Sequence, residues 1–271
     1  MINAMRKFFG YKFPRTGKFI NQILFKIIPP EIFCELFPKI KVTLNLKDLT
    51  HRATFWQGER FEFPTTRILK LWGGSSFFDI GANYGFYSFF MLTTFPDIQV
   101  YAFEPNLSTY NHILQIKEDN DSKSLQIFNI GLGSKETEAN LYLGGDDSGH
   151  STFLDHPDFL SILAEKVKIS TFDQWRVDQN LDLPKQPEWV AKIDVEGMEF
   201  DVLIGMKNAL EMKAFKGIII EVLDFTLALA NRKSKDIFNF MNSVGYKPIN
   251  EADLLSRYGR INTANVFFEQ I

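Results

Sequence analysis

The sequence predicts an α/β fold in which a mostly parallel sheet carries helices on both faces. From about Ser75 onward, short apolar runs of strand length alternate with segments of helix length, as βαβ units do. A glycine-containing turn follows the first apolar run directly, and acidic residues end two later runs. Right-handed crossovers would place the helices on alternate faces of the sheet, with any ligand at the carboxyl ends of the strands.

The elements of this sheet follow in order along the chain. The expected strands are the apolar runs at 75–81, 98–105, 125–133, 188–197 and 216–222, closed by an antiparallel pair at 246–251 and 264–271. The expected helices lie at 84–94, 107–118, 198–210 and 235–243. Two extra strands, 137–145 and 167–175, are expected around a polar loop at 144–151, which is an insertion candidate.

Residues 1–74 are expected to form an N-terminal extension that covers the main domain, 75–271, with a strand at 39–49 and a short helix at 63–72. The first thirty residues hold six basic side chains and no acidic one. A helix after Thr16 would have one apolar face, but polar residues interrupt it too often for it to span a membrane. We expect it to pack on its own domain, with peripheral contact with anionic lipid as the alternative.

Composition narrows the function classes. Hydrophobic residues make up 45% of the 271 residues and charged residues 23%, which is typical of a soluble globular protein. A net charge of -3 gives no reason to expect nucleic acid as a partner. The single cysteine, Cys34, excludes an intrachain disulfide and a cysteine-based zinc site, and it fits a cytoplasmic protein. No clustered histidine spacing predicts a metal site.

The first chemical signal is the turn Asp79-Ile80-Gly81-Ala82-Asn83-Tyr84-Gly85, which follows an apolar strand and opens a helix. Gly81 would let the backbone turn tightly beside a ligand, and Gly85 would let the helix approach the strand. The N–H groups at the start of the helix would face the ligand. A strand-to-helix turn also needs glycine for purely structural reasons, so this motif alone does not establish binding.

The second signal is Glu104, at the end of the next expected strand, 25 residues after Asp79. An acid there can accept two hydrogen bonds from a ribose diol, so a nucleoside ligand is favoured over a merely solvated strand end. Nicotinamide-binding proteins share this geometry. They usually carry G-x-G-x-x-G, whose middle glycine makes room for a pyrophosphate, and that pattern is absent here.

The third signal is the run from Lys192 to Glu199, KIDVEGME, at the end of the fourth expected strand. Asp194 and Glu196 are two residues apart, so in extended backbone they would point the same way. Two carboxylates placed together at the mouth of a sheet need a cation, hydrogen bonds or a proton to compensate them. The structural alternative is that Glu196 and Glu199 serve only to favour the start of a helix.

These segments together resemble the FkbM family of methyltransferases, whose hallmarks look like FDIGANYGFYS, AFEPN, NIGLG and KIDVEGMEFDVLIG as they stand in this chain. The resemblance runs from about Phe77 to Val222. It implies a Rossmann-like class I fold with a seven-stranded sheet, and S-adenosylmethionine as cofactor, lying over Gly81 to Gly85. Asp79, Gly81, Asn83 and Gly85 would shape the methionine side of that site.

The resemblance also places Glu104 at the ribose and Gly131 and Leu132 near the adenine. Asp194 would lie where donor and acceptor meet, with Glu196 beside it. The usual acceptor of the family is an oxygen, so the implied reaction is O-methylation of a hydroxyl on a saccharide or polyketide-like small molecule. Asp194 would then steer the sulfonium or accept the acceptor's hydrogen bond, and Glu196 would orient the cofactor's ammonium or serve as the base, with His150 in the polar loop as a further candidate base.

Two other function classes stay open from the sequence. One is a nicotinamide-dependent oxidoreductase, which the altered glycine pattern disfavours. The other is a non-catalytic binding module on a degenerate methyltransferase fold, which would keep the glycine turn but lose the acids at the strand ends. Both Glu104 and Asp194 are present.

Overall fold

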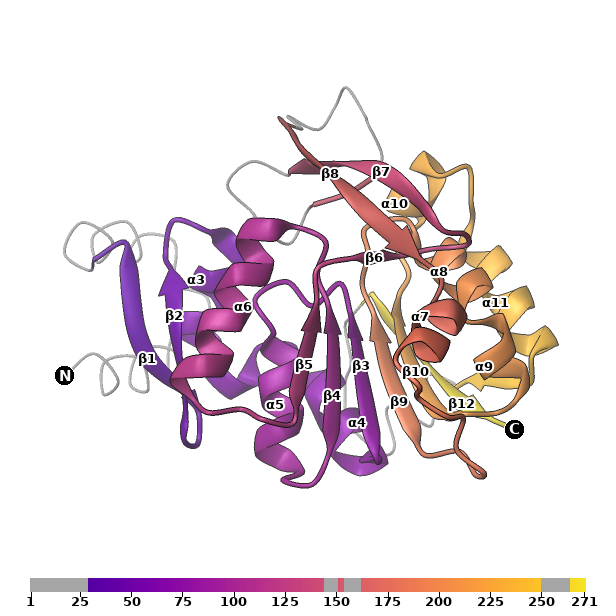
Figure 1. Cartoon of the computed structure of the whole chain (residues 1–271), viewed down its shortest axis with the longest axis horizontal. Coiled ribbons are helices and arrows are strands. Elements are labelled where there is room, and N and C mark those ends of the chain that lie inside the picture. The colour runs from indigo at the N-terminus through magenta and orange to yellow at the C-terminus, as the bar shows by residue number, and fades with distance from the viewer. Residues whose placement is uncertain (1–28, 144–150, 154–161, 250–263) are drawn as a thin grey trace.

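The computed structural model describes residues 29–143, 151–153, 162–249 and 264–271 (Figure 1). Its main sheet has seven strands in the order β11-β12-β10-β9-β3-β4-β5. The strands are β3 (Ser76–Ile80), β4 (Gln99–Phe103), β5 (Leu125–Phe128), β9 (Trp189–Ile193), β10 (Phe215–Glu221), β11 (Tyr246–Pro248) and β12 (Asn265–Gln270). Pairing is parallel from β5 to β10, while β12 runs antiparallel to both of its neighbours. The predicted fold class, with its antiparallel closing pair, is confirmed.

The strand order reverses between β3 and β9. The chain moves outward from β3 through β4 to β5, and then returns to pair β9 with the other side of β3. At this point the backbone N–H of Asp194 donates to the carbonyl of Ile80, at 2.9 Å. Ligands of open α/β sheets bind at such a reversal, at the carboxyl ends of the strands.

Helices cover both faces of the sheet (Figure 1). Alternate residues of each strand point to opposite faces, so each face has its own apolar core for helices to cover. Phe77 belongs to one core and Phe78 to the other. The first core lies under α3 (Leu49–Gln57), α4 (Phe63–Trp72), α5 (Phe86–Thr94), α6 (Leu107–Asp119) and the hairpin of β1 (Glu31–Phe37) and β2 (Ile40–Asn45). The second lies under α7 (Phe172–Asp178), α8 (Glu199–Gly205), α9 (Lys207–Glu211), α10 (Asp224–Leu229) and α11 (Ser234–Ser243).

A three-stranded sheet of β6 (Gly131–Leu132), β7 (Thr137–Leu143) and β8 (Ile162–Ser170) lies beyond the carboxyl ends of β3, β4 and β5 (Figure 1). It corrects two predictions. The strand predicted at 125–133 divides into β5 and β6, which belong to different sheets. The strand predicted at 167–175 ends at Ser170, because the side chain of Thr171 accepts a hydrogen bond from the N–H of Gln174 and starts α7.

The N-terminal segment contains more helices and strands than the sequence predicted. The strand predicted at 39–49 is the shorter β2, while β1, α3 and the 3₁₀ turn Gly58–Arg60 were not predicted. Their apolar side chains share one core with the sheet, so the division at residue 74 stays a prediction. The basic segment lies within residues 1–28, outside the described residues. No helix in the described ranges is both long and apolar enough to cross a membrane.

Candidate functional site

A cavity of about 230 Å³ opens at the strand-order reversal. Its walls come from the turn after β3, the ends of β4 and β10, β6, the loop after β9, the start of β12 and the N-terminal segment. The predicted site residues that line it are Gly81, Asn83, Glu104, Gly131, Leu132, Asp194 and Glu196. The sequence therefore identified residues from four separate segments that the fold brings to one cavity.

The turn after β3 depends on Gly81. Its φ of 81° lies in the left-handed region, and its N–H donates to the carbonyl of Phe103 at 3.1 Å. A Cβ at this position would lie 1.8 Å from the carbonyl oxygen of Asp194. Only glycine lets the backbone after β3 pass this close to the backbone after β9.

Asp79 and Gly85 lie behind this turn and do not line the cavity. The carboxylate of Asp79 is 1% exposed and accepts hydrogen bonds from both the N–H and the hydroxyl of Ser88, at 2.9 and 2.6 Å. Gly85 packs against the side chains of Phe89 and Ile113. Both residues shape the site indirectly, because they fix the start of α5 against the sheet.

Glu104 is buried at the end of β4, and both of its carboxylate oxygens are held by backbone. Oε2 accepts from the N–H of Asn83 at 2.8 Å, and Oε1 accepts from the N–H of Asn106 at 2.9 Å. The side chain of Asn129 holds the carbonyls of Glu104 and Pro105. Each carboxylate oxygen has a second lone pair, so Glu104 can still accept hydrogen bonds from hydroxyl groups. Burial raises its pKa to about 7.

We expect protein stability to fall as pH rises through 7. Burial raises the pKa of Asp79 from 3.8 to about 7 and that of Glu104 from 4.5 to about 7. A carboxyl whose folded pKa lies above its unfolded value stabilises the fold fully below the unfolded pKa, and that contribution is lost through the folded pKa. The melting temperature should therefore drop between pH 5 and 8, and Glu104→Gln should flatten the drop. Glu136→Gln, at an exposed glutamate, is the control and should leave the slope unchanged.

Gly131 and Leu132 form the short β6, which leads from the end of β5 over the cavity. A Cβ on Gly131 would lie 2.6 Å from the side chain of Ile169 and 2.9 Å from the ring of Phe153. This glycine therefore lets the β7–β8 arm lie close against the site. Leu141 and Phe153 add an apolar wall from that arm.

Three carboxyl groups gather at the other end of the cavity. The carboxylate oxygens of Asp194, Glu196 and Glu221 all lie within 4.8 Å of one another. The sequence predicted that Asp194 and Glu196 would point the same way because both were expected in extended backbone. In the structure β9 ends at Ile193 and Glu196 has a left-handed φ of 51°, so the two side chains meet for another reason. Glu221 was missed, although it ends the apolar run of the neighbouring strand. We assign no metal to this cluster, because acidic groups gather in this way without one.

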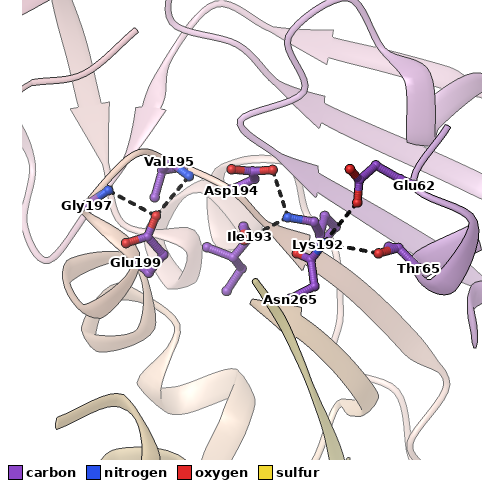
Figure 2. A network of polar contacts seen from close by, with 9 residues as sticks. All are labelled: Glu62, Thr65, Lys192, Ile193, Asp194, Val195, Gly197, Glu199 and Asn265. Carbon is purple, nitrogen blue, oxygen red and sulfur yellow. Dashed lines mark hydrogen bonds and ion pairs between the residues drawn. The ribbon is translucent and has the colours of Figure 1, made fainter. Parts of the chain in front are cut away.

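A buried ammonium lies beneath these acids. Figure 2 shows Lys192, Asp194, Glu62 and Asn265 gathered around one point. The Nζ of Lys192 donates to Oδ2 of Asp194 at 2.9 Å. The amide of Asn265 donates to Glu62 at 3.3 Å and to Thr65 at 3.1 Å. Sequence reasoning missed Glu62 and Asn265, since Glu62 immediately precedes α4, 130 residues before Lys192, and Asn265 begins β12, 66 residues after Glu199.

The loop after β9 is held by Glu199 (Figure 2). Its Oε1 accepts from the N–H groups of Val195 and Gly197, at 3.2 and 3.1 Å. Glu199 is therefore the acid that fixes the start of α8, whereas Glu196 lines the cavity. The sequence allowed a helix-start role for both Glu196 and Glu199. In the structure, Glu199 has this role. His150 lies outside the described residues.

Comparisons with known proteins agree with this geometry. A profile of the family described as the methyltransferase FkbM domain matches residues 79–248. The match begins within β3 and ends at β11, so it includes Gly81 and Glu104 at one end of the cavity and Asp194, Glu196 and Glu221 at the other.

Two curated relatives match parts of the chain. "Methyltransferase 1" of Beauveria bassiana is 23% identical over 159 residues, covering 54% of this chain and 64% of that protein. "AMB antimetabolite synthetase AmbE" of Pseudomonas aeruginosa is 27% identical over 180 residues, covering 54% of this chain and 8% of that protein. The chain thus spans less than two thirds of the length of both relatives.

Among solved structures, the O-methyltransferase TomG of Streptomyces achromogenes, in complex with S-adenosylmethionine, is 8% identical, with a TM-score of 0.44. The match covers 83% of this chain and 87% of that one. At these values the likeness adds nothing to the strand order described above.

Proposed function

Because the chain belongs to the methyltransferase FkbM domain family, we propose that it transfers a methyl group from S-adenosylmethionine to a hydroxyl oxygen of a saccharide or polyketide-like small molecule in the cytoplasm. The observation that carries the proposal is the cavity at the strand-order reversal. One end has the residues expected of a nucleoside site, and the other end has carboxylates. The described residues that line the cavity include no lysine, arginine or histidine.

The residues at the first end fit the cofactor. Gly81 presents backbone where a Cβ would clash, and Glu104 lies at the tip of the adjacent strand with its carboxylate fixed. Gly131, Leu132 and Phe153 bound the region between β6 and the arm, where a flat base can pack. S-adenosylmethionine supplies an electrophilic methyl group on a sulfonium when it is bound.

The chain's own contribution to the reaction is positioning and proton acceptance. Displacement at a methyl group needs the acceptor oxygen in line with the breaking bond, and holding it there supplies most of the acceleration. As the new carbon–oxygen bond forms, the hydroxyl proton must leave. Asp194 and Glu196 line the cavity and provide carboxylates that can accept that proton.

An oxygen acceptor is supported by the same acids. A neutral hydroxyl donates a hydrogen bond to a carboxylate, whereas an anionic acceptor would be repelled by the carboxylates of Asp194 and Glu196. The acids also argue against a degenerate binding module, since they remain at the strand ends. Family membership and the absence of G-x-G-x-x-G argue against a nicotinamide enzyme.

Calorimetric titration of the full chain tests the cofactor. We expect S-adenosylhomocysteine to bind in the micromolar range, about -8 kcal/mol, and NAD⁺ and NADP⁺ to bind far more weakly. The same titration separates the two enzyme classes. Tight nicotinamide binding with no response to S-adenosylhomocysteine would overturn the proposal.

Glu104→Ala should weaken S-adenosylhomocysteine binding by about 1.5–3 kcal/mol, because a charged acceptor to the ribose is lost. This corresponds to a dissociation constant raised by roughly 10- to 150-fold. Denaturant unfolding of the variant is the necessary control, since Glu104 also holds the N–H groups of Asn83 and Asn106. A stable variant with unchanged affinity would remove Glu104 from the binding site.

A further inference from the structure

Lys192 is a buried lysine near the carboxyl end of β9. Its side chain projects from β9 and is 1% exposed, so the ammonium lies inside the protein. Nζ donates to Oδ2 of Asp194 at 2.9 Å and to the carbonyl of Ile193 at 3.3 Å, and it lies 5.8 Å from the centre of the Tyr87 ring. A buried charge is strongly unfavourable unless an opposite charge and hydrogen bonds compensate it. Asp194 supplies that compensation directly.

Several acids surround this one ammonium. Asp194 and Glu196 come from the loop after β9, and Glu221 comes from β10. Glu62 approaches from the start of α4, and Asp79 from β3. Tyr87 of α5 is a further titratable neighbour. All these acids ionised together would leave a large excess of negative charge in a partly buried space, so the cluster must retain protons.

The contact between Glu221 and Asp194 indicates where one proton resides. Their carboxyl oxygens lie within 4.8 Å of each other, and two like charges this close raise the pKa of one group, so one of the two keeps a proton. Asp194 bonds the Lys192 ammonium directly, which favours the ionised form at Asp194. Burial and the charge of Asp194 raise the pKa of Glu221 to about 9. Glu221 is therefore the protonated member of this pair.

We propose that Lys192 is a positioning residue that keeps Asp194 ionised and oriented at the reaction centre, with Glu221 as the protonated partner on the same carboxylate. The inference rests on the proposed function only for the meaning of "reaction centre". In that reaction Asp194 faces the cavity as an anion of fixed direction, and Lys192 and Glu221 act through it.

The test is a pH titration of the full chain, labelled with ¹³C at the aspartate and glutamate carboxyl groups and followed by NMR. Asp194→Asn and Glu221→Gln identify the two signals by their loss. We expect Asp194 to be ionised at neutral pH and Glu221 to titrate only in the alkaline range. In Lys192→Met the midpoint of Asp194 should rise by about 1–3 pH units, since a nearby cation has been removed.

Lys213→Met is the matched control. The Nζ of Lys213 also donates to a backbone carbonyl, that of Val244 at 2.5 Å, and lies 5.2 Å from the centre of the Tyr246 ring. None of the carboxyl groups named above is in contact with it in the described part of the chain. This variant should leave the Asp194 midpoint unchanged, although it loses a similar set of contacts.

An Asp194 signal that is protonated at neutral pH would overturn the proposal, as would a midpoint that Lys192→Met does not move. If Lys192→Met does not fold, the titrations of the wild type and of Glu221→Gln still test whether Asp194 is ionised and Glu221 protonated. Glu221→Gln should remove the alkaline step from the Asp194 signal while leaving Asp194 ionised. The titration needs neither cofactor nor acceptor, so failure of S-adenosylhomocysteine to bind would reject the proposed function alone.

Discussion

Gly81→Ala is expected to destabilise the protein by about 2–5 kcal/mol and to weaken S-adenosylhomocysteine binding at least tenfold. A left-handed backbone costs a residue with a Cβ about 1–2 kcal/mol. The added methyl group would also lie 1.8 Å from the carbonyl oxygen of Asp194, and overpacking of this kind costs about 1–3 kcal/mol. The backbone after β9 must move away, and Asp194 and Glu196 move with it. Denaturant unfolding and calorimetry measure the two effects.

Gly85→Ala separates the clash from the backbone strain. Gly85 has the same φ of 81°, but a Cβ there would meet side-chain atoms of Phe89 and Ile113 at 3.0 and 3.3 Å. Those side chains can adjust, whereas the Asp194 carbonyl belongs to the backbone. We expect Gly85→Ala to lose stability from the left-handed conformation and to keep most of its cofactor affinity. Equal losses in both variants would show that the contact with Asp194 is not the cause.

Asp194→Asn and Glu196→Gln are expected to lower methyl transfer by about 10²-fold or more if their carboxylates accept the hydroxyl proton. Initial rates with labelled S-adenosylmethionine measure this once a screen of hydroxylated small molecules has identified an acceptor. The fold should survive in Asp194→Asn, because the amide oxygen can still accept from Lys192. Glu221, which then no longer has an anion beside it, can ionise and supply the missing charge.

Melting temperature and S-adenosylhomocysteine affinity are the controls for both variants, and both should remain near those of the wild type. Wild-type rates in two variants that fold and bind cofactor would mean that neither carboxylate is the base. His150 would then be the next candidate, and His150→Ala would be the variant to measure.

The sequence could predict that Gly81 and Glu104 line one end of the cavity because each of them follows from a local pattern. Gly81 and Glu104 end neighbouring strands, and parallel strands bring their carboxyl ends to one edge. Gly131 was also identified, although the run that contains it belongs to two sheets. Asp79 was assigned to the methionine side, whereas the structure turns its carboxylate toward Ser88. No pattern in one sequence shows which side of a buried strand faces a helix start.

The acidic end could be predicted only in part because it is built from distant segments. Asp194 and Glu196 stand in one motif, but Glu221 lies on the next strand and Glu62 precedes the sheet altogether. Asn265 reaches the cavity because β12 is antiparallel, so that its first residue pairs with Glu221, the last residue of β10. The pairing of strands is a tertiary property, and periodicity does not reveal it.

The position of β12 also constrains the order in which the chain can fold. β11 precedes β12 in the sequence, yet it pairs with β12 and not with β10, so β11 has no partner in the sheet until β12 has been synthesised. The hydrogen bond from Asn265 to Glu62 closes a separation of 203 residues. Contacts of such long range form late and slowly. During synthesis on the ribosome, the turn at Gly81 can therefore form long before Glu62 and Asn265 come together beside Asp194.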